Sequence, residues 1–279
     1  MLDLEPERQG PPPKPAATLI LLRDGEGGVE VFCVERNKKS RFLGGAIVFP
    51  GGKLDADDAD PAWVAQSLPP HPATFAEGDE LRALAVAACR ESLEEAAILP
   101  LDGALTHEEL LALRLDVAAK KETLRAFLAR RGLRVDLAAL HPFARWITPT
   151  VEARRFDARF FVARAPEGQP GAHDMAETMA SFWATPTDLL ARFERQEVQL
   201  APPTHRTVTV LAAAKTVDEA LADAARACLD PICPELVPQG DTLALTLPGD
   251  PQHSVKESRV PGPSRYVLRG EIWRAEEAP

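Results

Sequence analysis

Residues 89–98 read CRESLEEAAI and lie in an alanine-rich run with apolar residues at helical spacing. A helix would place the carboxylates of Glu91, Glu94 and Glu95 within an arc of roughly 100°. Like charges at this spacing repel one another, and Arg90 alone cannot neutralise three acids. The stretch therefore indicates either a solvated acidic face that tolerates a small penalty or a site that binds a cation.

The composition is that of a globular protein with a substantial core. The chain has 279 residues, of which 45% are hydrophobic, enough for one large domain or two small ones. Its formal net charge of −10 and the lack of a block rich in Lys and Arg argue against a nucleic-acid partner. No run reaches the roughly 18 apolar residues of a membrane span, and the N-terminus lacks signal-peptide features, so we expect a cytoplasmic protein without a membrane partner.

Changes in composition suggest three parts. Residues 1–15 are polar and proline-rich, which predicts an extended lead-in before a main domain at 16–227. Two stretches within that domain, about 55–78 and about 103–140, have the composition of insertions that carry short helices. Residues 228–279 contain too few large apolar side chains for a core of their own, so we expect an extension packed on the domain or on a partner subunit.

The order of the expected elements indicates a mixed α/β (α+β) fold. Short β-type runs occur at 17–23, 29–35, 144–148, 159–163 and 178–183, and a short β-rich C-terminal tail has further runs at 242–247 and 265–269. Helical spacing occurs at 80–97, 107–113, 120–130, 186–195 and 204–225. Because strands and helices do not alternate regularly, the pattern predicts a mixed sheet and not a series of βαβ units.

A glycine-rich loop precedes the acidic helix. Residues 41–52 read RFLGGAIVFPGG, an apolar run that ends in glycines able to adopt positive φ and to let a ligand approach the backbone. Together, loop and helix resemble the signature of the Nudix hydrolases, G-x5-E-x7-R-E-U-x-E-E-x-G-U, in which U is aliphatic. The resemblance implies an α/β/α sandwich around a mixed sheet and the hydrolysis of a diphosphate with Mg²⁺ or Mn²⁺.

The resemblance also assigns roles within the helix. Glu91, Glu94 and Glu95 would be metal ligands, and the carbonyl of Gly51 would be a further one. Glu91 would in addition accept a proton from water, and Arg90 would orient the glutamates by hydrogen bonding. The chemistry agrees, because Mg²⁺ prefers oxygen ligands and metal ions that bridge a diphosphate neutralise its developing charge.

The chain departs from the signature in its spacing. Gly52 and Arg90 are 38 positions apart where the pattern has 14, so 24 additional residues lie between them. A surface loop can absorb such an insertion at small entropic cost. Eight residues before Arg90, where the pattern has its first glutamate, this chain has Arg82. That role is therefore either vacant or filled by Glu80 or Asp55.

Two further departures lie in the helix itself. Ser92 replaces an aliphatic residue of the pattern, and Ala97 replaces its glycine. From the alanine we expect a helix end that needs no left-handed residue. Neither change removes an expected metal ligand.

Residues 41–52 also bear on the substrate, because R-x3-G-x3-F-P-G-G is similar to the second half of a signature found in the coenzyme A-cleaving branch of the family. This resemblance implies cleavage of CoA or acyl-CoA to 3′,5′-ADP and (acyl-)phosphopantetheine. The candidates for substrate binding are Arg41, Gly45, Gly52, Arg154 and Arg155, and the aromatic candidates for stacking on adenine or for the core are Phe42, Phe156 and Trp146. Glu177 is the candidate for an additional acid from outside the signature.

Three alternatives stay open at this point. The substrate could be ADP-ribose or a dinucleotide, or the domain could be a catalytically weak module that senses a ligand or binds a partner. The acidic helix could also be an ordinary solvated face. The expected partner is a small-molecule phosphoanhydride, and a homodimer is an arrangement that the sequence allows.

Overall fold

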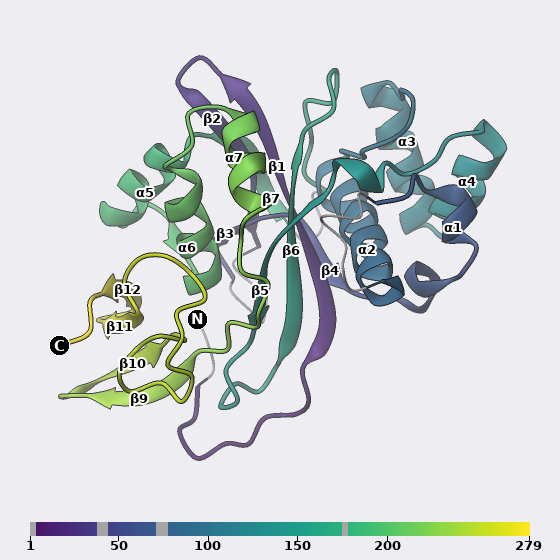
Figure 1. The fold of residues 1–279 in the computed structure, drawn as a ribbon. Coiled ribbons are helices and arrows are strands. Elements are labelled where there is room, and N and C mark those ends of the chain that lie inside the picture. Colours follow the sequence, from purple (N-terminus) through teal and green to yellow (C-terminus); the bar gives the residue numbers. More distant parts are fainter. Residues whose placement is uncertain (1–3, 38–43, 71–77, 175–177) are drawn as a thin grey trace.

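A mixed sheet runs through the middle of the molecule (Figure 1). The computed structural model describes residues 4–37, 44–70, 78–174 and 178–279. Eight strands form the sheet in the order β5-β6-β1-β2-β3-β8, with β4 paired to β1 and β7 paired to β2. The strands are β1 (Lys14–Gly25), β2 (Gly28–Arg36), β3 (Ala46–Val48), β4 (Gly51–Lys53), β5 (His141–Ile147), β6 (Phe156–Arg164), β7 (Thr178–Ala184) and β8 (Gln199–Leu200). Parallel pairing of β1 with β6 and antiparallel pairing of β1 with β2 confirm the mixed sheet.

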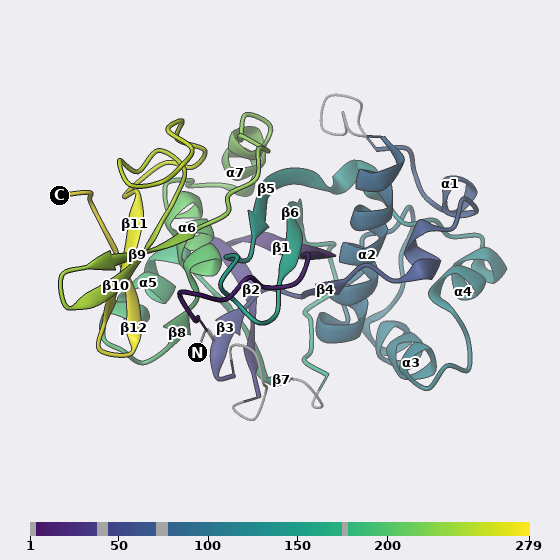
Figure 2. The same ribbon diagram turned by 90° about the horizontal axis from the view of Figure 1, so that it is seen from below.

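Helices cover both faces of this sheet, which confirms the α/β/α sandwich (Figure 2). On one side lie α1 (Trp63–Gln66), α2 (Asp79–Ala96), α3 (His107–Ala118) and α4 (Leu124–Arg131), with the 3₁₀ turns η1 (Ala56–Ala59) and η2 (Leu137–Ala139) nearby. On the other lie α5 (Pro186–Glu194), α6 (Pro202–Leu211) and α7 (Val217–Ala224). Among the helices of the described ranges, none has both the length and the apolar character needed to cross a bilayer.

Two separate buried clusters result from the alternation of side chains along the strands. On β1, Leu19 points into the cluster beneath α2, and Ile20 points into the cluster beneath α6. On β6, Phe161 and Val162 divide in the same way. Successive residues of a strand face opposite sides of the sheet, so each strand contributes to both cores.

Helix α2 is built from small residues that let it pack closely on β1 and β6. It begins at Asp79, with Gly78 as the N-cap, so the expectation that the helix starts at residue 80 is wrong by one position. Its last residue is Ala96, and the C-cap residue, Ala97, has φ 51° and ψ 38°. The expectation that no left-handed residue is needed here is therefore wrong, and Ala97 takes the conformation that favours glycine. Ser92 is fully buried and its hydroxyl donates to the carbonyl of Ile98 at 2.8 Å, which gives a polar residue a place in the core.

Two other expectations are corrected. Strand β1 starts at Lys14, because Lys14 and Pro15 already pair with Phe156 and Asp157 of β6. The single helix expected at 204–225 is two helices, α6 and α7, separated at residues 212–216. The hydroxyl of Thr216 accepts a hydrogen bond from the amide of Glu219 at 3.2 Å and starts α7 as its N-cap.

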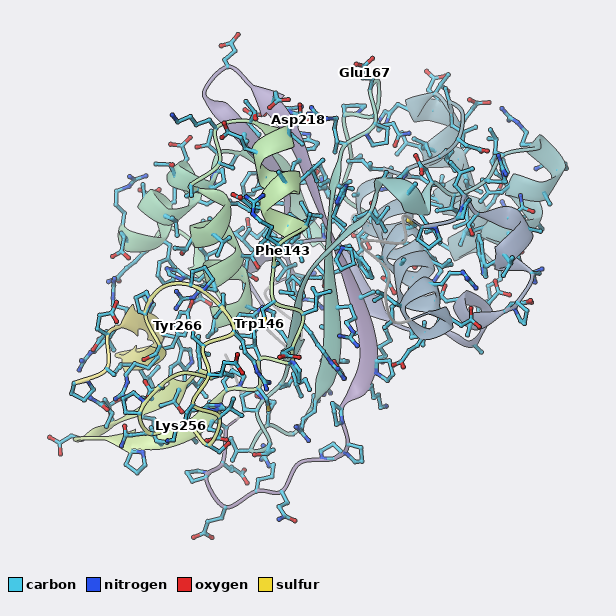
Figure 3. The ribbon with its side chains drawn as sticks, viewed as in Figure 1. Phe143, Trp146, Glu167, Asp218, Lys256 and Tyr266 are labelled. Atoms are coloured by element: carbon cyan, nitrogen blue, oxygen red, sulfur yellow. The ribbon has the colours of Figure 1, made fainter. Side chains whose placement is uncertain are left out.

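Beyond residue 228 the chain forms a second sheet of four antiparallel strands, in the order β12-β11-β10-β9. They are β9 (Glu235–Gln239), β10 (Thr242–Thr246), β11 (Arg265–Arg269) and β12 (Ile272–Glu276). Leu245 and Tyr266 of this sheet belong to the same buried cluster as Trp146 of β5. Figure 3 labels Tyr266 and Trp146. The C-terminal sheet, residues 235–276, thus shares the core of the main domain.

Candidate active site

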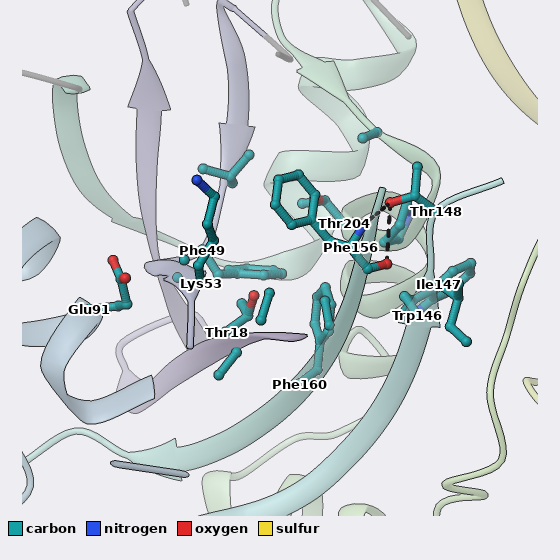
Figure 4. Close-up of a pocket in the computed structure, with 18 of the residues that line it drawn as sticks. Thr18, Phe49, Lys53, Glu91, Trp146, Ile147, Thr148, Phe156, Phe160 and Thr204 are labelled. Atoms are coloured by element: carbon teal, nitrogen blue, oxygen red, sulfur yellow. Dashed lines mark hydrogen bonds between the residues drawn. The ribbon is translucent and has the colours of Figure 1, made fainter. Parts of the chain in front are cut away.

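One end of the main sheet carries a cavity of about 590 Å³ that reaches from α2 to the C-terminal sheet. Its acidic end is lined by Glu91, Glu94, Glu95, Arg90, Gly51 and Gly52. Its aromatic end is lined by Phe49, Trp146, Phe156, Phe160 and Leu245. Figure 4 shows Glu91 on one side of this cavity and the rings of Phe156 and Phe160 on the other.

The glycine loop and the acidic helix meet, as the sequence predicted, because β4 pairs with β1 directly in front of α2. A Cβ atom on Gly52 would lie 2.3 Å from Oε1 of Glu91, and one on Gly51 would lie 2.6 Å from the carbonyl oxygen of Ala17. The amide of Gly51 donates to Oε2 of Glu95 at 3.1 Å. Glycine at 51 therefore lets β4 approach the backbone of β1, and glycine at 52 leaves the carboxylate of Glu91 in its present position.

Arg90 is the centre of a hydrogen-bond network. Its Nε and Nη2 atoms donate to the two carboxylate oxygens of Asp58 at 2.9 and 3.0 Å. Its Nη1 atom donates to Glu91 at 2.9 Å and to Glu94 at 3.3 Å, and Nη2 also donates to the carbonyl of Lys53 at 2.9 Å. One guanidinium thus ties the loop after β4 to two of the three glutamates.

Asp58 is a site residue that the sequence analysis missed. It is 2% exposed, and it lies six positions after Gly52, which is where the signature has its first glutamate when counted forward from the glycine. Counting back from Arg90 gave Arg82, because the insertion follows Asp58. The position is therefore not vacant, and Asp58, not Glu80 or Asp55, occupies it and pairs with Arg90. Counting forward from Gly52 finds this residue in the sequence.

The site holds more negative than positive charge. Burial raises the pKa of Glu91 to about 7, against the effect of Arg90 and helped by the charge of Glu94. Burial likewise raises the pKa of Glu94, again opposed by Arg90. Asp58 and Glu95 add two further buried acids. Because a bound cation would reduce the repulsion between these desolvated carboxylates, their arrangement favours cation binding.

The donors fit a hard divalent cation in chemistry, although the described residues contain no preformed group of three His, Cys, Asp or Glu ligands. Every candidate ligand is an oxygen, the type that Mg²⁺ and Mn²⁺ prefer, and Mg²⁺ commonly uses few carboxylates plus water and phosphate. Glu91 and Glu94 turn Oε1 toward Arg90, so their Oε2 atoms are the ones that could meet an ion.

Only some of the expected substrate-binding residues lie at the cavity. Gly52 and Arg154 line it, and Arg154 is exposed. Gly45 does not line it and forms a turn with φ 78°. Arg155 does not line it either, because its Nε donates to the carbonyls of Thr148 and Pro149, both at 3.1 Å. The remaining candidates, Arg41, Phe42 and Glu177, lie outside the described residues.

Arg36 is a second residue that sequence reasoning missed. It stands at the end of β2 and lines the cavity, and its Nε atom is buried without a hydrogen-bond partner among the described residues. A buried guanidinium nitrogen without a partner suits an anionic group of a ligand. No local pattern marks Arg36, because an arginine at the end of a strand is common on protein surfaces.

Comparison with known proteins agrees with this geometry. Residues 76–211 match the family described as the NUDT19 Nudix domain. A crystal structure of a Nudix hydrolase from Alicyclobacillus acidocaldarius is 32% identical, with a TM-score of 0.66, over 75% of this chain and 96% of that one. The chain belongs to the Nudix hydrolase family.

Among curated proteins, the chain is similar to members of one branch of the family. The acyl-coenzyme A diphosphatases NUDT19 of Homo sapiens and Gallus gallus are 29% and 30% identical to this chain, over 74% and 62% of its residues. The matches cover 64% and 58% of those two proteins. The chain thus spans about three fifths of the length of the curated relatives.

Proposed function

We propose that this protein hydrolyses a nucleoside diphosphate linked to another moiety, with Mg²⁺ or Mn²⁺, and that its substrate is CoA or acyl-CoA. The observation that carries the proposal is the surplus of buried and partly buried carboxylates around Arg90, which face the glycine strand in one cavity. A surplus of this kind lowers stability unless cations offset it. The names of the curated relatives support the choice of CoA as substrate.

Each residue of the acidic end has a role in this reaction. Glu91, Glu94, Glu95 and the carbonyl of Gly51 would hold the metal, which when bound stabilises charge on the diphosphate and activates water. Arg90 holds the carboxylates of Glu91 and Glu94 in place through the hydrogen bonds described above. In the reaction, the oxygen of water bonds to one phosphorus, the bridging P–O bond breaks, and the bridging oxygen leaves on the other phosphate.

Glu91 is the residue we assign to accept the proton of that water. It contacts the glycine strand more closely than Glu94 does, and it faces the cavity beside Gly52. General bases act within hydrogen-bond reach of the proton that they remove, so a position at the cavity wall is required. Arg90 keeps Glu91 in that position through its Nη1 atom.

Cations along the cavity favour CoA over diphosphates with fewer phosphates. CoA carries a third phosphate on its ribose, and Lys53, Arg36 and Arg154 are the basic side chains near the site that could meet its phosphates. ADP-ribose and dinucleotides without this group would leave one of these cations unused. They remain the alternative substrates within the same class of reaction.

The test is product analysis with purified protein, Mg²⁺ or Mn²⁺, and a panel of CoA, acyl-CoA, dephospho-CoA and ADP-ribose. We expect 3′,5′-ADP and phosphopantetheine from CoA with metal, and no product with EDTA. Arg154→Ala should raise KM for CoA and leave KM for dephospho-CoA unchanged. Binding of these compounds without turnover of any would instead support the ligand-sensing alternative.

A further inference from the structure

The C-terminal sheet forms part of the wall of the cavity. Leu245 of β10 is 1% exposed and lines the aromatic end together with Pro234, which precedes β9. Leu245 lies in the same buried cluster as Trp146 and Phe160. The family match ends at residue 211, so this wall comes from outside the matched segment.

Hydrogen bonds fix the sheet in this position. The amide of Ile147 donates to the carbonyl of Ile232 at 2.9 Å, and the amide of Ile232 donates to the carbonyl of Arg145 at 2.8 Å. The segment before β9 thereby extends the main sheet beyond the edge of β5. Such ladder bonds hold the register of neighbouring strands, so Pro234 has a defined place at the cavity.

A second anchor connects the sheet to the first turn of α6. The hydroxyl of Tyr266, a fully buried residue of β11, donates to the carbonyl of Pro202 at 3.2 Å and lies 3.1 Å from Nδ1 of His205. Arg206 donates to the carbonyls of Pro261 and Pro263. Pro202, the first residue of α6, also lines the cavity. The C-terminal sheet therefore forms one part of the cavity wall with Leu245 and fixes another part, the start of α6, through Tyr266.

We propose that this aromatic end binds the base of the substrate nucleotide, adenine in CoA, and that Leu245 determines how deeply the base enters. The inference rests on the proposed function. Phe49, Phe156 and Phe160 line this end together with Leu245. Figure 4 shows the three phenylalanine rings, and flat bases stack on such rings. Arg154 lies two residues before Phe156 and is suited to a phosphate on the attached ribose.

The chemistry of the wall favours a base over an acyl chain. Thr148 and Thr204 line the same end, and they place hydroxyl groups beside the rings. The hydroxyl of Thr148 already bonds to the backbone of Phe156, so the hydroxyl of Thr204 is the one that can meet the polar edge of a base, an edge that an acyl chain lacks. The diphosphate at the acidic end would then have the nucleoside on this side and the pantetheine arm toward the opening.

Calorimetric titration with the two products tests the inference, since neither can be hydrolysed. With Mg²⁺ present, we expect Leu245→Trp to weaken binding of 3′,5′-ADP at least about tenfold, because the indole fills the space of the base. Binding of 4′-phosphopantetheine should change less than about twofold, since that product lies outside this end. Leu243→Trp, on the same strand but away from the cavity lining, is the matched control and should leave both affinities unchanged.

Phe156→Ala keeps the test decisive if Leu245→Trp does not fold, because Phe156 is only half-buried. It should weaken 3′,5′-ADP about tenfold, the loss expected for one stacking contact. Weaker phosphopantetheine binding with unchanged 3′,5′-ADP binding would overturn the inference and place the other arm here. Absence of 3′,5′-ADP binding to the wild type would also overturn it. If 3′,5′-ADP binds as expected but no diphosphate is hydrolysed, only the proposed function fails.

Discussion

Two arginine–aspartate pairs, one partly buried and one fully buried, have almost the same geometry and opposite surroundings. Arg90 donates to both oxygens of Asp58 at 2.9 and 3.0 Å, and Arg265 donates to both oxygens of Asp250 at 2.9 and 2.7 Å. In the C-terminal sheet, Asp250 also accepts from the hydroxyl of Ser264 at 2.7 Å and Arg265 donates to the side chain of Gln239 at 2.7 Å. These additional partners are neutral, so the pair is balanced.

Around Arg90 the additional side-chain partners are acids. Glu91 and Glu94 share its Nη1 atom, and Glu95 lies on the same helix against Gly51. A balanced pair can be satisfied entirely by the protein, whereas a pair with surplus carboxylates needs a cation from outside. The difference shows how one type of contact stabilises the fold in one region and prepares a binding site in another.

The largest expected effect comes from breaking the balanced pair. Asp250→Asn leaves the buried guanidinium of Arg265 without a counter-charge, and we expect it to lower the free energy of unfolding by about 3–5 kcal/mol. Asp58→Asn should cost less, about 1–2 kcal/mol in the absence of metal, because Arg90 keeps Glu91 and Glu94. Urea denaturation in EDTA measures both, and equal losses would contradict the distinction between the two pairs.

Removing one surplus acid should affect turnover and not folding. We expect Glu94→Gln to lower turnover of CoA at least about a hundredfold, because one group that stabilises charge in the transition state is lost. The melting temperature without metal should not fall, since the change removes a repelling charge. Glu276→Gln, which alters a surface ion pair with Arg269, is the matched control. Near-normal turnover of Glu94→Gln would reject the role assigned to this residue.

The anchor of the C-terminal sheet should make stability depend on pH. Burial lowers the pKa of His205 to about 4, helped by Arg206 and Arg274 and opposed by Glu194. Below pH 6.5 the unfolded chain binds a proton that the folded protein does not bind until about pH 4, so stability falls as pH falls. Between pH 6.5 and 5 this histidine should cost on the order of 1.5 kcal/mol.

His205→Asn isolates that contribution, because every other titrating group stays the same. Denaturant midpoints of wild type and variant across this pH range should differ in slope, with the variant less sensitive to acid. Parallel slopes would show that His205 is not the group that responds.

The smallest effect is expected at the end of α2. Ala97→Gly relieves a left-handed alanine, worth about 1 kcal/mol, but it removes a fully buried methyl group worth about 0.8 kcal/mol. The two terms nearly cancel, so the free energy of unfolding should change by less than about 0.5 kcal/mol. A gain or loss above about 1 kcal/mol, measured by urea denaturation, would mean that one of these terms has been misjudged.

The sequence predicted the elements that depend on local signals. Strands β1 and β2 and the helix of the three glutamates follow from periodicity and turn residues. The meeting of that helix with Gly51 and Gly52 is what the resemblance to the Nudix signature implied. Asp58 could also have been predicted, because its distance from Gly52 is intact. The insertion between Asp58 and Arg90 lengthens only their separation in the sequence. The two side chains still form a hydrogen bond in the structure.

Other features were beyond prediction because they depend on contacts between distant segments. The shortage of large apolar residues in the C-terminal sheet predicted that it packs on another surface, but no local pattern shows that this surface is formed by Trp146 and α6. Arg155 resembled a phosphate-binding residue, and only the structure shows that backbone carbonyls already occupy it. The left-handed Ala97 likewise reflects the chain path after α2 and not the preference of alanine.

Binding of Mn²⁺, followed by electron paramagnetic resonance of the free ion, tests the central claim most directly. If the surplus carboxylates on α2 form a cation site, the wild type and Glu276→Gln should bind Mn²⁺ equally. Glu94→Gln should bind it at least about tenfold more weakly, the loss expected when one oxygen ligand becomes an amide. Equal affinity of Glu94→Gln and wild type for Mn²⁺ would contradict the account.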